Sequence, residues 1–549
     1  MAQAGEQAVG IDFGTSTSLL AVGSGVGPVD IAPLGRTTRS FPSIAGYQQG
    51  NLLVGEAAEN LPIAQVIRSV KRAITDCSET MEISDEHGTR RVDVDEVIVA
   101  LLAEIGTRAK AAGRPLDTRE QVRLGCPAMW DGAQRQRLLD HAQNAGLPVA
   151  HSTLIDEPIA AGVAWVRHRY LQYGEQVEGR LLVFDMGGGT LDIAVLDVVG
   201  GPHPEISVLS ALGVQLAGDR LDTAIAGEIT EELAGQGIRL DGLPEAKTVE
   251  ALVLREARTA KIQLTTQARH RIVFRGLART QLPILTYTRE QLEECFRPQM
   301  DQAIGLVWAA LRAAKLTELG GHAPDKLRGM NGDRLAADID YVLLAGGMSR
   351  VPYVERRIGE LFPNAMIYDA AGVAADELIV AGLADPVGYD RLNLHRPGFD
   401  FVLEYTESGR KITEKIYPAY TPFYSPEEAW TNSYLGFERR GDDFPGPKRG
   451  EGVLRVRSTS GDYLALRYDG ETKHGLRLQL GWNMLFKIYC DGQILITDGA
   501  RQTRKLRVHQ WPVVRGNGHA ELVLQRVDDA PPVPSTAWYL EKEYAPPGL

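Results

Sequence analysis

The stretch RLLVFDMGGGTLDIAVLDV, Arg180 to Val198, decides the fold. An apolar run ends at Asp185, three glycines follow, and a second apolar run begins at Leu191, so the pattern predicts strand, glycine turn and strand. Glycines let a phosphate approach the backbone and collect N–H donors, while Thr190 and Asp192 supply a hydroxyl and a second acid. Because the Asp185 carboxylate would repel a phosphate, we expect a cation between them, and Mg²⁺ with a nucleotide is the natural pair. P-loop and dinucleotide-binding folds are disfavoured, because their glycine loops lead into a helix and the second run here is β-branched.

A second copy of this pattern lies near the start of the chain. Ile11 to Val22, IDFGTSTSLLAV, aligns without a gap on Phe184 to Val195, FDMGGGTLDIAV. In this alignment five pairs of identical residues coincide, namely Asp12 with Asp185, Gly14 with Gly187, Thr17 with Thr190, Ala21 with Ala194, and Val22 with Val195. Two acid-glycine hairpins predict a duplicated domain that holds phosphates between two similar halves.

Composition is that of an ordinary globular protein, with 44% apolar and 24% charged residues in 549, enough for roughly three or four domain-sized units. The formal net charge of −12 gives no basic surface for nucleic acid or anionic lipid. Four scattered cysteines without a CxxC pattern predict reduced thiols rather than disulfides or a zinc site. No basic segment followed by an apolar run opens the sequence, and no stretch is long enough to span a bilayer. We therefore expect a cytoplasmic protein with neither nucleic acid nor membrane as partner.

Apolar spacing around the two hairpins predicts alternating helices and strands. Helices are expected at 66–74, 97–109, 134–145, 158–165, 220–234, 249–264 and 290–311. The apolar strand 341–345 enters a glycine pair, and Ser349 can cap the helix that follows. Taken alone, Lys71 in the basic cluster SVKRAI reads as part of a solvated helix face, and Asp156 and Glu157 read as helix caps.

From about residue 392 the helical spacing gives way to alternation of apolar and polar residues. Leu464, Leu466 and Tyr468 alternate with other side chains, and Asp491-Gly492 between FKIYC and QILIT predicts a hairpin. We expect a linker at 387–399, a mostly antiparallel, sandwich-like β domain at 400–526 that binds substrate or partner, and an irregular Pro-rich tail at 527–549. Residues 427–452 are expected to form a long loop.

Four motifs in order, IDFGTSTS, LIDEPIAAGVAW, VFDMGGGTLDIAV and LLAGGMSRVPYV, resemble the actin-like ATPases. In detail the chain is similar to the nucleotide-binding domain of the 70-kilodalton heat-shock chaperone family, from Val9 to about Pro386. The resemblance implies an α/β fold, with a duplicated actin-like ATPase domain over residues 1–386 whose two lobes enclose a nucleotide cleft, followed by the β domain. It also implies ATP or ADP with Mg²⁺ as cofactors, and low intrinsic ATP turnover.

The resemblance implies roles for individual residues. It replaces the interpretation of Lys71 as a surface lysine and of Glu157 as a helix cap. Lys71 is implied to reach the γ-phosphate and Glu157 to orient the attacking water, with Asp185 and Thr190 as further catalytic residues. Asp12 and Asp185 are implied to hold Mg²⁺ through its waters. Together these groups would supply the charge neutralisation and alignment that phosphoryl transfer needs. The residues implied to bind the nucleotide are Gly14, Thr15, Ser16, Gly187, Gly188, Gly189, Thr190, Lys261, Thr265, Gly346, Gly347, Ser349 and Arg350.

The sequence departs from the family pattern at three places. Arg258 stands where the family has an acid on the helix that contacts adenosine, and AGDRLD at 217–222 replaces a glycine pair followed by an acid. The third departure is that neither an acidic, leucine-rich linker nor a helical lid is visible in the sequence.

We expect an ATPase of the chaperone type, whose nucleotide state modulates how the β domain binds an unfolded polypeptide or a dedicated protein client. A co-chaperone or exchange factor is a candidate further partner. Two alternatives stay open: a metabolic enzyme that uses the fold for ATP-dependent phosphorylation or activation of a small molecule, and an ATP-gated scaffold with little turnover. Retention of Lys71 and Glu157 argues against an inactive ATPase, and no substrate base stands out in the cleft.

Overall fold

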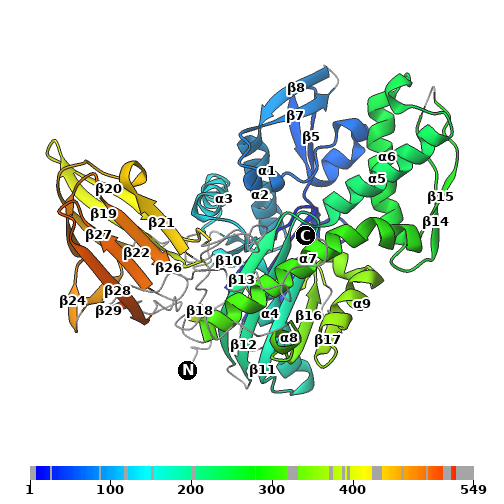
Figure 1. Cartoon of the computed structure of the whole chain (residues 1–549). Helices are drawn as coiled ribbons and strands as arrows, with labels where there is room; N and C mark the ends of the chain where they lie inside the picture. Colours follow the sequence, from blue (N-terminus) through cyan, green and yellow to red (C-terminus); the bar gives the residue numbers. More distant parts are fainter. Residues whose placement is uncertain are drawn as a thin grey trace.

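The structure is a computed structural model of the whole chain, shown in Figure 1. It describes residues 8–24, 27–85, 88–116, 122–149, 154–200, 204–277, 280–318, 332–369, 375–385, 390–391, 396–422, 436–458, 461, 463–468, 470–489, 493–510 and 521–526. We call residues 8–385 of this set the α/β part and residues 396–526 the β part. The tail expected at 527–549 and most of the linker expected at 387–399 lie outside the described residues. Within the described residues, no helix has both the length and the apolar character needed to cross a membrane.

The first glycine hairpin forms the centre of a six-stranded sheet. β1 and β2 pair antiparallel, β9 and β10 extend the sheet in parallel, and the order is β10-β9-β1-β2-β3, with β4 also paired to β2. Helices α2 and α3 share an apolar core with these strands. The elements are β1 (Ala8–Phe13), β2 (Thr17–Gly23), β3 (Asp30–Ile31), β4 (Phe41–Pro42), β9 (Val122–Cys126), β10 (Leu154–Asp156), α2 (Val94–Ala111) and α3 (Gly132–Asn144).

The second glycine hairpin forms the centre of another six-stranded sheet, with the order β17-β16-β11-β12-β13-β18. Its apolar side chains pack on α4 on one side and on α7 on the other. Figure 1 shows these helices against the strands. The elements are β11 (Gly179–Met186), β12 (Leu191–Val199), β13 (Glu205–Val214), β16 (Tyr341–Ala345), β17 (Met366–Asp369), β18 (Asp390–Arg391), α4 (Glu157–Tyr173) and α7 (Arg289–Glu318).

The two hairpins have the same register. Asp12 lies opposite Leu19 in the first hairpin, and Asp185 lies opposite Asp192 in the second. The predicted strand, turn and strand are therefore confirmed in both halves, and so is the duplicated α/β fold.

The two halves meet where α4 crosses α10 (Leu378–Leu383). A Cβ atom placed on Gly382 would overlap the carbonyl oxygen of Ala160 in α4, and one on Gly10 of β1 would lie 2.6 Å from the Cβ of Leu383. Backbone therefore lies directly against backbone at this crossing, which only glycine permits.

Smaller elements complete the two lobes around the sheets. They are β5 (Ala45–Gln48), β6 (Asn51–Val54), α1 (Arg72–Thr75), β7 (Thr80–Asp85), β8 (Gly88–Asp93), α5 (Gly218–Gly235), α6 (Ala246–Gln263), β14 (Arg269–Ile272), β15 (Leu285–Thr288), α8 (Gly332–Ala336) and α9 (Pro352–Leu361). The helices predicted at 97–109, 134–145, 220–234, 249–264 and 290–311 are confirmed by α2, α3, α5, α6 and α7.

The helix predicted at 66–74 is wrong, because only Arg72–Thr75 is α-helical in that region. Ile67 instead forms a β-bridge with Ala45, and Ser69 has a left-handed backbone with φ 54°. A residue in that conformation interrupts an α-helix, so the helix begins only after Lys71.

The β part consists of two sheets whose inner faces share one apolar core, with Phe401 and Leu454 of one sheet packed on Ile494 and Leu506 of the other. The strand orders are β20-β19-β22-β25 and β21-β26-β27-β28-β29-β23-β24, and β23 with β29 is the parallel pair among otherwise antiparallel neighbours in the described strands. Figure 1 shows this part beside α3. Its strands are β19 (Phe399–Glu407), β20 (Arg410–Tyr417), β21 (Gly436–Arg440), β22 (Gly450–Ser458), β23 (Ala465–Tyr468), β24 (Glu471–Lys473), β25 (Leu476–Leu480), β26 (Leu485–Tyr489), β27 (Gln493–Thr497), β28 (Thr503–Gln510) and β29 (Glu521–Arg526).

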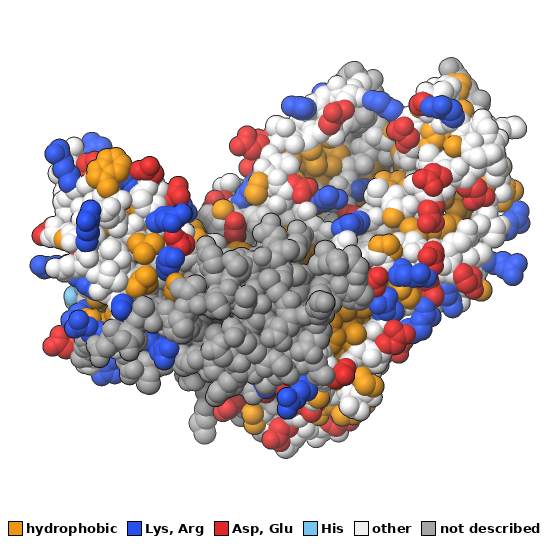
Figure 2. Space-filling view, viewed as in Figure 1, with side chains coloured by type: hydrophobic (Ala, Val, Ile, Leu, Met, Phe, Trp, Pro, Cys, Tyr) orange, Lys and Arg blue, Asp and Glu red, His pale blue; other side chains and the backbone are white. Residues whose placement is uncertain are grey.

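Two predictions for the β part have different outcomes. β26 and β27 pair antiparallel as the FKIYC and QILIT runs predicted, although the turn itself, at 490–492, lies outside the described residues. The long loop predicted at 427–452 is wrong where β21 and the start of β22 lie, because Phe437 packs on the ring of Tyr417 at 5.0 Å and anchors a strand there. On the face in Figure 2, acidic and basic side chains are interspersed over both parts.

Candidate functional site

The glycine turns of the two hairpins lie side by side on the wall of a cavity of about 280 Å³. A Cβ on Gly188 or Gly189 would lie 3.1 Å from the Ser16 hydroxyl oxygen or 2.8 Å from the Thr15 hydroxyl oxygen, respectively. The structure brings these predicted residues together on the cavity wall: Asp12, Gly14, Thr15, Ser16, Lys71, Glu157, Asp185, Gly187, Gly188, Gly189, Thr190, Lys261, Gly346 and Gly347. The two turns thus approach each other closely, which glycine permits, and both border the same cavity.

Gly346 belongs to this wall because the chain must pass close to Asp185 there. Its backbone is left-handed, with φ 76°, and a Cβ would lie 2.5 Å from Oδ1 of Asp185. Glycine tolerates both the positive φ and the close approach to Asp185. The turn that follows β16 can therefore lie on the cavity wall beside Asp185.

Three predicted residues do not line the cavity. Thr265 is half-buried and donates from its hydroxyl to the Ile262 carbonyl at 2.7 Å. Ser349 donates to the Gly346 carbonyl at 2.7 Å and does not cap α9, so the predicted cap is wrong; residues Gly347–Arg350 form a 3₁₀ turn that this hydroxyl closes. Arg350 is exposed and forms an ion pair at 3.1 Å with Asp376, which lines the cavity.

Lys71 and Glu157 form a buried ion pair at the cavity wall. Lys71 comes from the turn before α1 and Glu157 is the first residue of α4, so tertiary folding alone unites them. Burial by itself would lower the pKa of Lys71, but the carboxylates of Glu157 and Asp12 outweigh burial and raise that pKa. The ammonium group is therefore held charged, where it can meet an anionic ligand.

Buried carboxylates surround this single ammonium group. Burial, and then the charge of Glu157, raise the pKa of Asp12 to about 7. Burial and the neighbouring Asp192 raise the pKa of Asp185 well above its usual value, and burial followed by Glu157 raises that of Asp192 to about 7. Four carboxylates beside one lysine leave an excess of negative charge that a bound cation would relieve.

The residues present fit Mg²⁺ held through water. Among the described residues, no group of three or more His, Cys, Asp or Glu side chains is placed to coordinate a metal ion directly. Asp12 and Asp185 are both buried on the cavity wall, and their pKa values are raised by burial and then by neighbouring carboxylates, whose negative charge a bound ion would offset. Mg²⁺ keeps several of its waters in such sites, and carboxylates accept hydrogen bonds from those waters.

The opposite rim carries a charged cluster that the sequence did not predict as a unit. Asp222 lies 2.7 Å from the Lys261 ammonium and 3.0 Å from Nε of Arg258, and Arg258 also reaches Asp219 at 3.3 Å. The backbone of the same loop supports the glycine turn, because the N–H of Gly218 donates to the Gly187 carbonyl at 3.1 Å. The departures from the family pattern at 217–222 and at Arg258 thus complement one another.

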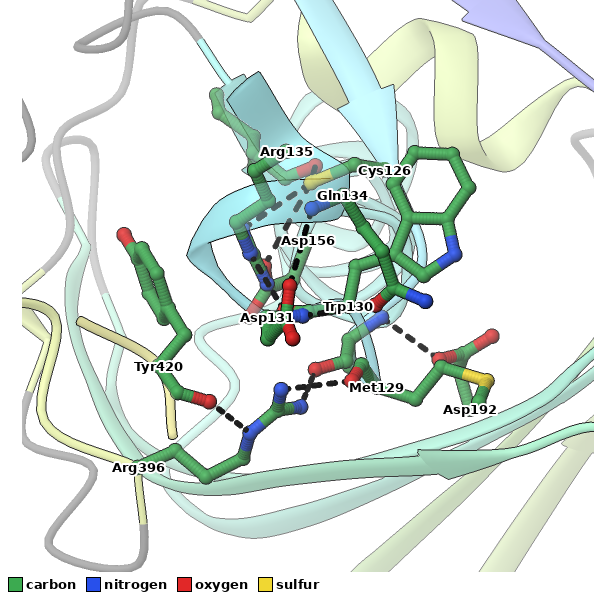
Figure 3. A network of polar contacts seen from close by, with 12 residues as sticks. Cys126, Met129, Trp130, Asp131, Gln134, Arg135, Asp156, Asp192, Arg396 and Tyr420 are labelled. Carbon is green, nitrogen blue, oxygen red and sulfur yellow. Dashed lines mark hydrogen bonds and ion pairs between the residues drawn. The ribbon is translucent and has the colours of Figure 1, made fainter. Parts of the chain in front are cut away.

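A network of polar contacts connects the back of the cavity with the β part (Figure 3). The N–H of Ala128 donates to Oδ1 of Asp192 at 2.7 Å. Arg396, which precedes β19, donates to the carbonyls of Ala128 and Met129, the latter at 2.6 Å, and to the Tyr420 carbonyl at 3.0 Å. One short backbone segment therefore contacts an acid of the site on one side and the β part on the other.

The same network includes a buried arginine on α3. Arg135 pairs with Asp156 at 2.6 Å, donates to the Cys126 sulfur at 3.1 Å, and lies over the Tyr420 ring at 4.0 Å. Asp156 makes no side-chain cap to α4, so its reading as a helix cap is wrong. Its carboxylate forms the ion pair with Arg135 instead. No local sequence pattern signals these pairings, because the partners lie on different elements.

The Hsp70 protein family model matches residues 8–385 of this chain. The chain is similar to chaperone protein DnaK of Thermotoga petrophila, 30% identical over 414 residues that cover 71% of this chain and 62% of DnaK. DnaK of Thermosipho africanus is 30% identical over 403 residues (70% and 59% coverage), and DnaK of Nitrosopumilus maritimus is 28% identical over 395 residues (69% and 56%). The match thus spans less than two thirds of the length of these relatives.

Proposed function

The chain belongs to the Hsp70 protein family, and from this premise we propose that it binds Mg·ATP between its two glycine turns and hydrolyses it slowly, as an ATP-driven chaperone. The observation that carries the proposal is the meeting of Asp12, Asp185 and the Lys71–Glu157 pair on one cavity wall. These groups come from four separate segments, and their assembly matches the demands of phosphoryl transfer.

In this proposal the glycine turns bind the phosphates through backbone N–H groups, and Asp12 with Asp185 holds Mg²⁺ through its waters. The metal would neutralise charge on the phosphates during transfer. Lys71 has three N–H donors, so it can keep Glu157 while it donates to the terminal phosphate. Glu157 accepts a hydrogen bond from the attacking water and so orients it. Lys261 and Gly346 border the nucleoside end of the cavity.

We assign polypeptide binding to the β part. Its outer described strands, β20 and β25 in one sheet and β21 and β24 in the other, offer backbone groups to an extended segment. Two exposed aromatic side chains, Tyr463 and Trp482, add apolar contact area. Nucleotide-dependent control of this binding would use the contacts of Arg396 with the segment beside Asp192.

The test is ATP turnover by the full chain, measured with and without unfolded peptides. We expect Glu157→Gln to keep Mg·ATP binding and to lose turnover by about a hundredfold, which is typical when a group that positions a proton transfer is removed. Glu232→Gln, an exposed acid on α5, is the matched control and should turn over like the wild type. Asp185→Asn should lose the Mg²⁺-dependent part of ATP binding in calorimetry.

Two results would refute this function. Turnover of Glu157→Gln at the wild-type rate would remove Glu157 from the reaction. Turnover stimulated by a small metabolite, with no binding of labelled unfolded peptides in anisotropy measurements, would favour a dedicated metabolic enzyme instead.

A further inference from the structure

A second cavity, of about 480 Å³, lies between the α/β part and the β part. It is larger than the 280 Å³ cavity at the glycine turns and has the size of small-molecule sites. One wall comes from the first turns of α3 and from Leu154, and the other comes from β19, β20 and β22 with the segments that follow β20 and β22. That second wall lies beyond residue 385, where the family match ends.

The charged side chains that line this cavity carry an excess of positive charge. They are three cations, Arg135, Lys415 and Arg457, and one carboxylate, Asp400. Asp400 is buried. Its carboxylate forms ion pairs with the Arg457 guanidinium at 2.9 Å and the Lys415 ammonium at 3.3 Å, and it accepts a hydrogen bond from the Ala419 N–H at 2.7 Å. Even when Arg135 is counted as neutralised by Asp156, one positive charge remains beside the cavity.

A hydrogen-bond donor in the same place is unsatisfied. Within the part of the chain that the structure describes, Nε of Arg457 is buried and has no acceptor. A buried N–H without an acceptor costs about 1–3 kcal/mol, and the cost is larger for a charged group. An anionic oxygen entering the cavity could accept this bond, and a guanidinium group suits carboxylate and phosphate oxygens equally.

The apolar part of the wall and its backbone also indicate a formed site. Leu154, Pro418 and Ala419 line the cavity beside the charged groups. Tyr420 is held in a left-handed backbone, with φ 62°, between the Arg396 bond to its carbonyl and the Arg135 guanidinium over its ring. Such a backbone costs on the order of 1–3 kcal/mol and is concentrated at ligand-binding positions.

We propose that this cavity binds a small organic acid. Its carboxylate or phosphate group is held by Arg457 and Lys415, and its apolar body lies against Leu154, Pro418 and Ala419. The cavity walls come from both the α/β part and the β part. Binding of the acid therefore stabilises the contact between the two parts. By linkage, that contact in turn strengthens binding of the acid by the same free energy.

The experiment is calorimetric titration of the full chain with benzoate and, separately, with phenyl phosphate. We expect at least one probe to bind at a single site, and the stronger of the two identifies the preferred anion. Arg457→Gln should weaken that binding about tenfold or more, the usual effect of losing a charged hydrogen bond. Arg467→Gln, on β23 and exposed, is the matched control and should bind like the wild type.

A second variant keeps every charge in place. Ala133 is exposed in the first turn of α3 and lines the cavity, so Ala133→Phe fills the space with little demand on folding. We expect this variant to abolish probe binding while its melting temperature stays near that of the wild type.

Three results would overturn the proposal. The first is that neither probe binds at millimolar concentration. The second is binding that survives both Arg457→Gln and Ala133→Phe. The third is displacement of the probe by Mg·ADP in direct competition, with both variants still binding it, which would place the probe at the glycine turns.

Discussion

Replacing Arg396 by methionine tests what holds the α/β part and the β part together. Arg396 is 3% exposed and donates to the carbonyls of Ala128 and Met129 in the α/β part. A hydrogen bond from a charged donor contributes about 1.5–3 kcal/mol, so the loss of both bonds should cost about 3–6 kcal/mol of contact free energy. Methionine retains a flexible apolar stem of similar length, so the change mainly removes the donors.

The assay is native-state hydrogen exchange of the amides at 128–131. If the two parts of the variant separate more often, this segment is exposed to water more often, and exchange should accelerate by at least about a hundredfold where the parts touch. Amides in the centre of β11 should exchange as in the wild type, because that strand lies inside its own sheet. Arg467→Met is the control for loss of one arginine from the β part.

Unchanged exchange at 128–131 in Arg396→Met would refute the reasoning. It would mean that other contacts hold the parts together and that the carbonyl bonds add little. An acceleration of the same size throughout the α/β part would instead show that the variant destabilises the whole fold, which the wild-type behaviour of β11 is designed to exclude.

Three further predictions concern the cavity at the glycine turns and the crossing of α4 and α10. Burial raises the pKa of Asp12 from 3.8 to about 7, so the folded chain binds this proton more tightly, and stability falls as pH rises through that interval. In thermal melts without nucleotide, Asp12→Asn should match the wild type near about pH 4 and be more stable near about pH 8, by on the order of a few kcal/mol. By calorimetry, Lys261→Ala should weaken ATP binding about tenfold and Thr265→Ala should leave it unchanged, because only Lys261 lines the cavity. Gly382→Ala should cost about 3 kcal/mol or more in denaturant unfolding, because its Cβ would overlap a backbone oxygen of α4, whereas Gly227→Ala in α5 has open space and should not destabilise.

Each of these expectations has a contrary outcome. Equal melting temperatures of Asp12→Asn and the wild type at both pH values would show that burial of the charged Asp12 carboxylate does not destabilise the fold. Equal loss of ATP affinity in Thr265→Ala and Lys261→Ala would place Thr265 at the nucleotide. A fully stable Gly382→Ala would show that α4 and α10 can move apart at low cost.

Features set by neighbouring residues were predictable from the sequence. Apolar runs broken by glycine predicted both hairpins, and their alignment predicted that Asp12 and Asp185 occupy equivalent positions, as the shared register confirms. Long helices such as α2 and α7 followed from apolar spacing for the same reason. Each of these signals lies within one segment and needs no knowledge of the rest of the chain.

Features set by tertiary contacts were not predictable from local pattern. Lys71 and Glu157 are 86 residues apart, and by local pattern alone they read as a surface lysine and a cap; the family resemblance supplied their roles. Nothing near Ser69 signals its left-handed backbone, which ended the predicted helix. Ser349 precedes a helix, so the sequence pattern favoured a cap, but the 3₁₀ turn at Gly347–Arg350 brings its hydroxyl to the Gly346 carbonyl instead.

The backbone contact between Gly382 and Ala160 restricts how the two lobes can move. The atoms at this point are already in contact, so the lobes cannot move closer together there. They can still rotate relative to one another about the crossing of α4 and α10. Any opening is then angular, and its amplitude grows with distance from the crossing. The greatest displacement should fall on the outer rim, where the Lys247 ammonium donates to the Thr89 hydroxyl at 2.9 Å across the gap. A pair of labels at that rim would register a small rotation that is undetectable beside the glycine turns.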